Sequence, residues 1–475
     1  MRLSTHYGLG CNQSSLDFID VPTNDDVSLH IDPRAIAALP SDWGQECIAL
    51  IRDFFSSVLA AVRDNNYTVG HDLLNQLREP KETHLGYSVQ GTSGRGVGQL
   101  KADYLWDALR QSRAVSSGLL ENLEETALLV EGIDRDIISD ITTNIIREPL
   151  IEYTQAACQF YQIPLHQDVD SGPLWNPKKK EWFSKYVHLP IVGGWKLLLV
   201  PKVIVRLQLV YNQDEYYRHY ILEELRHAEL ASHSPLVQVL KNGRTRVTNK
   251  SLQAKYGTGK AVLISQTLRH PSALDKYRRA KAEPSEPLTH IQLAVTTAGL
   301  PDWEQLLNNV LSLKPGAAAA DAYEKAILAL LNAVFYPSLV DPDPQCEIHE
   351  GRKRVDIRFT NMGHRGFFYW LAQHYPSSYV WIECKNYSSD PGNPEVDQLI
   401  GRFSPKRGKV GMLTCRFLSD KPLLLKRCRD AALADQGYII ALDDDDLRTL
   451  VKQRMSPKTE TAFPLLQERF SELVN

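Results

Sequence analysis

The sequence has too few suitably placed cysteines for a disulfide-stabilised or zinc-bound fold. Its 475 residues include seven cysteines, an odd number, and no two of them form a Cys-X-X-Cys pair. Secreted disulfide frameworks usually have an even set of cysteines, and zinc sites of the knuckle type need closely spaced thiolates. The cysteines therefore indicate free thiols in a reducing, cytoplasmic environment.

The sequence also lacks a long apolar run without charges. The most apolar long stretch, residues 189–210, contains three cations, Lys196, Lys202 and Arg206, and has Pro201 in its middle. A membrane-spanning helix tolerates such residues poorly, so short strands fit this stretch better. The first residues contain no apolar segment of the signal-peptide type. We therefore expect no membrane contact.

No excess of one charge sign marks the chain. The formal net charge is −3, and charged residues make up 23% of the sequence. A nucleic-acid ligand would therefore be bound by a local basic patch and not by the overall charge of the chain.

The length predicts more than one domain, because single hydrophobic cores rarely exceed about 250–300 residues. We divide the chain into a mainly helical region at 1–165, an α+β middle region at 166–311, and an α/β domain at 312–475. The middle region has predicted strands at 186–190, 195–201 and 203–211. The first region includes a glycine-rich loop at 91–99 that leads into a helix. Two proline-containing segments, 268–288 and 312–316, are interpreted as connectors that let the parts move.

The C-terminal domain has the clearest pattern of helices and strands. Apolar periodicity predicts, in order, a helix, three strands, and then alternating helices and strands. Their ranges are 321–335, 345–350, 354–360, 379–385, 393–403, 409–415, 420–436 and 437–442. The predicted order is α-β-β-β-α-β-α-β, which is typical of an α/β domain with a mixed sheet.

Polar side chains share one face of two neighbouring strands in this domain. Alternation places Asp356 opposite to the apolar face of its strand, and it places Glu383 and Lys385 together on one face of the next. Two buried carboxylates repel each other, and a hard divalent cation such as Mg²⁺ removes that conflict. An ammonium group beside the metal can polarise an attacking water and stabilise charge on a phosphorane-like transition state.

Two helices are expected to support the same site. Glu324 lies on an apolar stripe with Leu328, Leu331 and Phe335, so it faces inward and needs a partner. Gln398 flanks the apolar stripe of the helix at 393–403, where it can orient a water or a phosphate oxygen.

With these residues in this order, the segment 318–415 resembles the PD-(D/E)XK nuclease superfamily, and the tail "GYIIALDDDDLRTLV" is similar to its Mrr-like branch. The resemblance covers about a third of the chain and implies a restriction-endonuclease-like fold with an α-β-β-β-α-β core. Asp356 takes the place of the family's aspartate and Glu383-Cys384-Lys385 that of its (D/E)XK motif. Glu324 and Gln398 take the places of its first-helix acid and following-helix glutamine. Val355 stands where the family commonly has proline.

The resemblance implies a metal-dependent DNA endonuclease that acts on foreign DNA, with Mg²⁺ as cofactor and Mn²⁺ as a substitute. The metal ligands would be Asp356, Glu383 and the backbone carbonyl of Cys384. Because cutting both strands needs two sites, we expect a homodimer or a larger even assembly. A basic cluster is expected to contact phosphates beside the site: Lys406, Arg407 and Lys409.

The N-terminal region is assigned to recognition, assembly or restraint of the nuclease. Two alternatives stay open. The chain could be a non-catalytic nucleic-acid-binding or scaffold protein with a degenerate nuclease fold. It could also be a repair nuclease that processes branched DNA.

Overall fold

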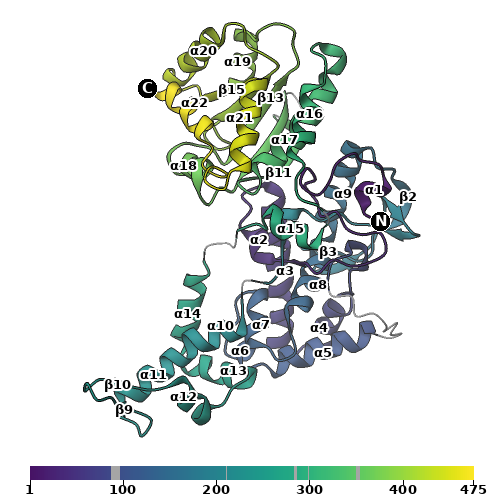
Figure 1. The fold of residues 1–475 in the computed structure, drawn as a ribbon. Helices are drawn as coiled ribbons and strands as arrows, with labels where there is room; N and C mark the ends of the chain where they lie inside the picture. Colours follow the sequence, from purple (N-terminus) through teal and green to yellow (C-terminus); the bar gives the residue numbers. More distant parts are fainter. Residues whose placement is uncertain (87–96, 210, 283–285, 298, 349–352) are drawn as a thin grey trace.

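The computed structural model describes the chain except for residues 87–96, 210, 283–285, 298 and 349–352 (Figure 1). The glycine-rich segment up to residue 96 and the last two residues of the predicted strand at 345–350 lie outside the described residues. In Figure 1, a domain built on one sheet, drawn in green and yellow, lies above a larger and mainly helical part. No described helix is long and apolar enough to cross a membrane.

The N-terminal part is a group of helices around one long helix, α3. Ser41 caps α3 by accepting a hydrogen bond from the Gly44 amide, and the apolar residues of α3 recur at helical spacing on its buried face. The helices and 3₁₀ turns of this part are α1 (Leu3–His6), α2 (Pro33–Ala37), α3 (Asp42–Arg63), α4 (Tyr67–Leu74), η1 (Lys81–Thr83), α5 (Val97–Gln111), α6 (Arg113–Ser116), η2 (Leu123–Glu125), α7 (Thr126–Leu129), α8 (Arg135–Ile145) and α9 (Arg147–Tyr161).

Small two-stranded sheets pack against these helices. The pairs are β1 (His30–Ile31) with β8 (Val205–Arg206), β2 (His166–Asp170) with β5 (Tyr186–Leu189), β3 (Leu174–Asn176) with β4 (Glu181–Phe183), and β6 (Ile191–Val192) with β7 (Trp195–Lys196). The β6–β7 hairpin turns at Gly193 and Gly194, where the sequence predicts a turn. Both glycines have positive φ, which a residue without Cβ adopts at little cost.

The predicted strands at 195–201 and 203–211 are largely wrong. Leu197–Val200 lies outside the strands, and Pro201 is followed by a 3₁₀ turn, η3 (Lys202–Ile204). Leu197, Leu199 and Val200 are buried in the large N-terminal core, and Leu198 is buried in a small cluster with residues of α9, β3 and β5. Their hydrophobicity therefore reflects burial and not sheet pairing.

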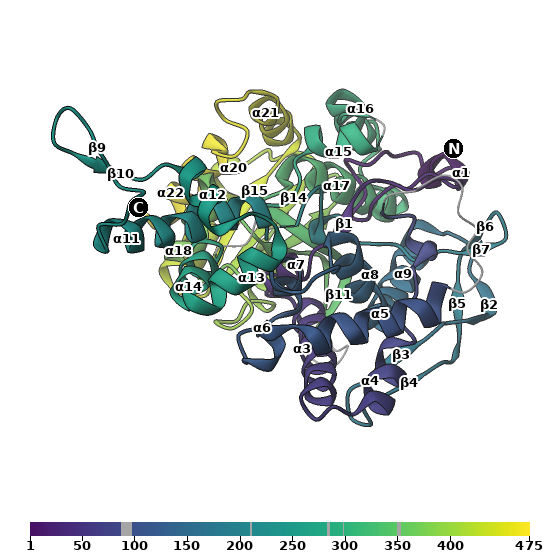
Figure 2. The same cartoon turned by 90° about the horizontal axis from the view of Figure 1, so that it is seen from below.

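The predicted connector at 268–288 is also corrected, because it contains α14 (Pro271–Ala280). Pro271 occupies the first turn of the helix, where its missing N–H costs no hydrogen bond, and Ala273, Leu274 and Tyr277 are buried. The neighbouring elements are α10 (Gln213–Tyr216), a π-helical turn η4 (Tyr217–Ile221), α11 (Leu222–Ala231), β9 (Gln238–Val239), β10 (Thr245–Arg246), α12 (Asn249–Tyr256), α13 (Lys260–Arg269) and α15 (His290–Thr296). The β9–β10 hairpin projects from the body in both views (Figures 1 and 2).

The C-terminal part is a mixed α/β domain with a five-stranded sheet in the order β11-β12-β13-β14-β15. Neighbours are antiparallel from β11 to β13 and parallel from β13 to β15. Its elements are α16 (Trp303–Leu311), η5 (Ala317–Ala319), α17 (Ala320–Phe335), β11 (Leu339–Ile348), β12 (Lys353–Asn361), α18 (Gly366–His374), β13 (Tyr379–Lys385), α19 (Asn393–Ile400), β14 (Val410–Cys415), α20 (Lys421–Leu433), β15 (Tyr438–Leu442), α21 (Asp444–Met455) and α22 (Pro464–Val474).

Two large hydrophobic cores underlie this division. The first extends from Leu3 to Leu293 without a break at residue 165, so residues 1–165 and most of 166–311 share one core. The second contains the five-stranded sheet and takes in Leu306 and Val310 of α16, which begins before the predicted boundary at 312. Tyr336, directly after α17, and Val340, near the start of β11, belong to the first core, so the two parts meet at the α17–β11 connection.

Candidate functional site

The candidate site lies where β12 and β13 stop pairing. The antiparallel register runs from Thr360 opposite Tyr379 to Ile357 opposite Ile382. One further step places Asp356 opposite Glu383, and directly opposed residues share one face of the sheet. There the Asp356 carboxylate accepts a hydrogen bond from the Cys384 backbone N–H at 2.7 Å. The carboxylate thus holds the two strand ends together beside Glu383.

Glu383 is the best-buried acid of the site, with 1% of its surface exposed. Its Oε1 accepts hydrogen bonds from Lys385 Nζ at 2.7 Å and from Gln398 Nε2 at 2.5 Å. Lys385 Nζ also donates to Gln398 Oε1 at 3.3 Å. The second oxygen of Glu383, Oε2, is buried and has no hydrogen-bond partner.

Helix α19 brings Gln398 over this face of the sheet. Gly392 precedes α19 and donates its backbone N–H to the Glu395 side chain at 2.7 Å, while Pro394 occupies the first turn. The sheet leaves room for α19 at Gly411 of β14, where an added Cβ would lie 3.0 Å from the Leu399 side chain. The position of Gln398 therefore depends on a residue without a side chain beneath α19.

Burial raises the pKa of both carboxyls at the strand ends. For Asp356, the Cys384 N–H and the Lys385 ammonium oppose this rise in pKa. For Glu383, the negative charge of Asp356 raises the pKa further, and Lys385 opposes it. Burial lowers the pKa of Lys385, but the Glu383 carboxylate more than offsets this, so the lysine pKa is raised and the ammonium form is favoured. The contacts of the two carboxylates thus offset the effect of their burial only in part.

Glu324 approaches the site from α17 without a direct contact to the other candidates. Its carboxylate accepts a hydrogen bond from the Gln345 side chain of β11. Burial raises the Glu324 pKa to about 7, and the charge of Asp356 adds to this effect against the Gln345 hydrogen bond. Glu324 therefore interacts with Asp356 through the repulsion between their negative charges.

The donor set at the strand ends fits a hard divalent cation. Among the residues that the structure describes, no group of three or more His, Cys, Asp or Glu side chains lies close enough to hold a metal ion. Mg²⁺ usually keeps several waters and is bound through one or two carboxylates, so it needs no such group. Asp356, Glu383 with its unpartnered Oε2, and the backbone carbonyl of Cys384 are of the right chemical kind.

Two arginines that lie beside the acids, Arg354 and Arg402, are absent from the site predicted from the sequence. Arg402 Nε donates to the backbone carbonyl of Arg354 at 2.8 Å, and the charges of both arginines lower the Asp356 pKa. Arg354 lies two residues before Asp356 on the same strand, and Arg402 lies four residues after Gln398, just past the end of α19. The same spacing rules that place Asp356 and Gln398 would therefore have found both arginines.

The basic cluster predicted to lie beside the site lies at the other end of the sheet. Lys406, Arg407 and Lys409 precede β14, whose first residue, Val410, pairs with Val380 at the start of β13. Glu383 pairs with Leu413, four residues further along than Lys409, which is about 13 Å of strand. Lys409 Nζ instead binds the Asp435 carboxylate at 3.1 Å. The physical reason is that the connection between two parallel strands carries the chain back to the end of the sheet where both strands begin. The residues just before β14 therefore lie away from the end of β13 that carries Glu383.

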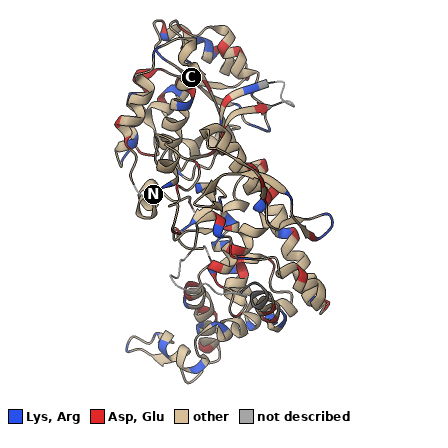
Figure 3. Cartoon of the chain, turned by 90° about the vertical axis from the view of Figure 1, so that its right-hand side faces the viewer, with Lys and Arg blue, Asp and Glu red and all other residues tan. Residues whose placement is uncertain are grey.

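Charged residues of both signs are interspersed over both parts of the chain (Figure 3). The local arrangement at the strand ends, and not the overall surface charge, therefore distinguishes this site.

Comparison with known proteins gives one match. Residues 8–212 match the model of a family described as a domain of unknown function, DUF8370. This match covers less than half of the chain and includes none of the candidate site residues. No curated protein and no solved structure matches the chain.

Proposed function

We propose that the chain is a metal-dependent nuclease of the PD-(D/E)XK type that hydrolyses phosphodiester bonds in DNA with Mg²⁺, or with Mn²⁺ in its place. One observation carries the proposal: Glu383, Lys385 and Gln398 bond to one another beside Asp356, which accepts the Cys384 N–H at the end of the β12–β13 pairing. The mixed order of the five strands supports a restriction-endonuclease-like core. The resemblance alone suggests a role against foreign DNA.

Some residues of the proposed site would bind the cation, and others would act on the attacking water and the phosphate. Asp356, Glu383 and the Cys384 carbonyl would hold the cation. A bound cation supplies polarisation of a water and of a phosphate oxygen. Lys385, kept as an ammonium by Glu383, can donate a hydrogen bond to the attacking water or to the phosphate. Gln398 fixes both Lys385 and Glu383 through its amide group.

Two further contributions follow from the electrostatics. Glu324, with its pKa raised to about 7, can accept or release a proton near neutral pH, as a general acid or base requires. Arg354 and Arg402 lie beside the acids and would offset the charge of a bound phosphate.

The test is cleavage by the full-length protein of plasmid, linear duplex, branched duplex, single-stranded DNA and RNA, each with Mg²⁺, Mn²⁺ or a chelator. Asp356→Asn and Glu383→Gln are compared with Asp397→Asn, a control on the exposed face of α19. We expect metal-dependent cleavage of DNA by the wild type and the control, and none by the two site variants.

Three results would contradict the proposal or redirect it. DNA binding without cleavage under any metal condition would favour the non-catalytic alternative. Cleavage of branched duplexes alone would favour a junction-processing nuclease. Equal cleavage by Asp356→Asn and the wild type would place the activity outside this site.

A further inference from the structure

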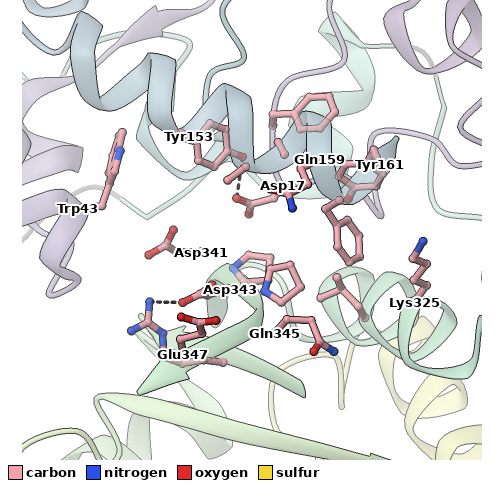
Figure 4. Close-up of a pocket in the computed structure, with 18 of the residues that line it drawn as sticks. Asp17, Trp43, Tyr153, Gln159, Tyr161, Lys325, Asp341, Asp343, Gln345 and Glu347 are labelled. Atoms are coloured by element: carbon pink, nitrogen blue, oxygen red, sulfur yellow. Dashed lines mark hydrogen bonds and ion pairs between the residues drawn. The ribbon is translucent and has the colours of Figure 1, made fainter. Parts of the chain in front are cut away.

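A cavity of about 920 Å³ opens between the two parts of the chain (Figure 4). One wall comes from α9, the segment around Phe18 and the start of α3, and the other comes from α17 and β11. Acidic residues outnumber basic ones in its lining. The acids are Asp17, Asp42, Glu152, Asp321, Glu324, Asp341, Asp343 and Glu347, and the bases are Lys325, Arg354 and Arg358.

We call the part of the cavity between α9 and β11, where Asp17 and Asp341 lie, its inner wall. Asp17 is a buried acid with one carboxylate oxygen that has no partner. It is 7% exposed, and its Oδ2 accepts a hydrogen bond from the Tyr153 hydroxyl at 2.9 Å. Its Oδ1 is buried without a hydrogen-bond partner. Figure 4 shows the carboxylates of Asp17 and Asp341 facing the same space, between α9 and β11.

Lys202 offsets the charge of Asp17 only in part, whereas Asp341 has its own partners in Arg358 and the Thr360 hydroxyl, which donates to it at 3.3 Å. Lys202 Nζ bonds the Ser14 carbonyl and the Asn332 side chain, both at 3.4 Å, and lies 4.2 Å from the centre of the Tyr336 ring. Burial raises the pKa of Asp17 to about 7, Lys202 opposes this rise, and the Asp341 charge adds to it. A cation in the cavity would offset the free-energy cost of burying the Asp17 carboxylate, and it would reduce the repulsion between Asp17 and Asp341.

The remaining walls favour an organic cation over a metal ion. Trp43 and Tyr153 place their ring centres 6.3 Å apart, and Phe160 and Tyr161 place theirs 5.0 Å apart. Ammonium groups are attracted to the faces of such rings. The volume lies in the range of about 300–1,000 Å³ that small-molecule pockets have, far more than one ion fills.

We propose that this cavity binds a small organic cation with two or more ammonium groups, of the aliphatic polyamine class. One ammonium group lies between Asp17 and Asp341, and the chain runs along Trp43 and Tyr153 toward the acids at the rim. Because Asp17 comes from the N-terminal part and Asp341 from β11, the ligand joins the two parts. The cavity is also lined by Glu324 and Arg354 of the proposed nuclease site, but binding of the cation does not require nuclease activity.

The experiment is calorimetric titration of the full-length protein with spermidine at low salt, without DNA. Two variants remove one charge each from the inner wall: Asp17→Asn, which keeps an acceptor for Tyr153, and Asp341→Asn. Asp64→Asn, an exposed residue at the end of α3, is the matched control. Thermal unfolding of each variant shows whether it is folded.

We expect saturable binding of spermidine to the wild type and the control, and a Kd at least tenfold higher in each folded inner-wall variant. Raising the salt concentration should weaken binding, because the attraction is electrostatic. Absence of spermidine binding to the wild type would overturn the proposal. Binding that both inner-wall variants keep, or displacement of spermidine by equimolar Mg²⁺ alone, would overturn it as well.

Discussion

Replacing Lys202 with methionine is expected to destabilise the chain strongly, because this lysine is a charge at the junction of the two cores. Lys202 lies in the 3₁₀ turn after Pro201 and is fully buried, at 0% exposed. Its ammonium group contacts Asn332 and Tyr336 of the C-terminal part and the Ser14 carbonyl of the N-terminal part. The charge of Asp17 opposes the fall in the Lys202 pKa that burial causes.

The magnitude follows from the charge that the substitution leaves behind. Methionine keeps most of the volume of the lysine, but the buried Asp17 carboxylate then loses its nearest cation. Removing one partner of a buried ion pair in direct contact typically costs about 3–5 kcal/mol, whereas replacing both partners is often close to neutral. Lys202 and Asp17 interact through charge without a direct ion pair, so we expect Lys202→Met to lower the free energy of unfolding by about 3 kcal/mol or less, and Asp17→Asn with Lys202→Met to recover about half of the loss or more.

The assay is urea unfolding of the full-length protein at pH 7.5, followed by tryptophan fluorescence. At this pH most of Asp17, with a pKa of about 7, and most of Lys202, with a pKa of about 8, are charged. Lys325→Met is the control, because Lys325 is an exposed lysine on α17 that lines the same cavity. The reasoning is refuted if Lys202→Met unfolds within about 1 kcal/mol of the wild type. It is also refuted if the double variant is less stable than Lys202→Met alone.

Four further predictions concern the site, the pH dependence and the assembly. Lys385→Met should slow single-turnover DNA cleavage by about 10²–10³ while the fold is kept, and near-wild-type cleavage would contradict its proposed role. Asp356→Asn should weaken Mg²⁺ binding in calorimetry while it still accepts the Cys384 N–H, and unchanged affinity would place the metal elsewhere. Burial and the charge of Lys202 lower the pKa of His290 to about 3, below its unfolded value, so its contribution to stability is present above pH 6.5 and is lost as the pH falls toward 3. His290→Gln should therefore reduce the fall in unfolding free energy between pH 6 and 4.5 by about 1.4 kcal/mol per pH unit, and an unchanged slope in denaturation curves would argue against a neutral buried histidine. Light scattering should show an even homo-oligomer with or without DNA, and a monomer under both conditions would refute the two-site argument.

The arrangement of the site residues on the sheet could be anticipated from the sequence because it depends on local rules. Val355, Ile357 and Phe359 are each 0% exposed, as the alternation in β12 predicts. Strand alternation places Glu383 and Lys385 on one face without any knowledge of distant residues. The register that brings Asp356 opposite Glu383 is not local, but the apolar face of each strand limits it strongly.

Helix α18, between β12 and β13, is absent from the predicted order of elements. Its sequence, "GFFYWLAQH", is short and mostly aromatic, and aromatic residues favour strands as much as helices. Phe367, Phe368 and Leu371 are buried in the C-terminal core, so packing and not propensity makes this segment helical.

The strand cluster at 195–211 was mispredicted for a related reason. Apolar residues without a clear period are compatible with a strand or with any segment that crosses a helical core. Lys202 and Arg206 are buried here because acids far away in the sequence, Asp17 and Asp32, interact with their charges. No local sequence pattern predicts such partners. Only the tertiary contacts therefore explain why two cations lie in an apolar stretch.

The junction of the two cores changes how the N-terminal part can act on the proposed nuclease. Freely hinged domains would need the segments at 268–288 and 312–316 to be flexible, but α14 occupies much of the first. Tyr336 and Val340 of the C-terminal part are buried in the N-terminal core. The chain on either side of Tyr336 carries Glu324, on α17, and its partner Gln345, on β11. A fragment that begins at residue 312 would therefore expose Tyr336 and Val340 and loosen the elements that position Glu324. Loss of activity in such a fragment would therefore reflect a disturbed site as readily as lost recognition.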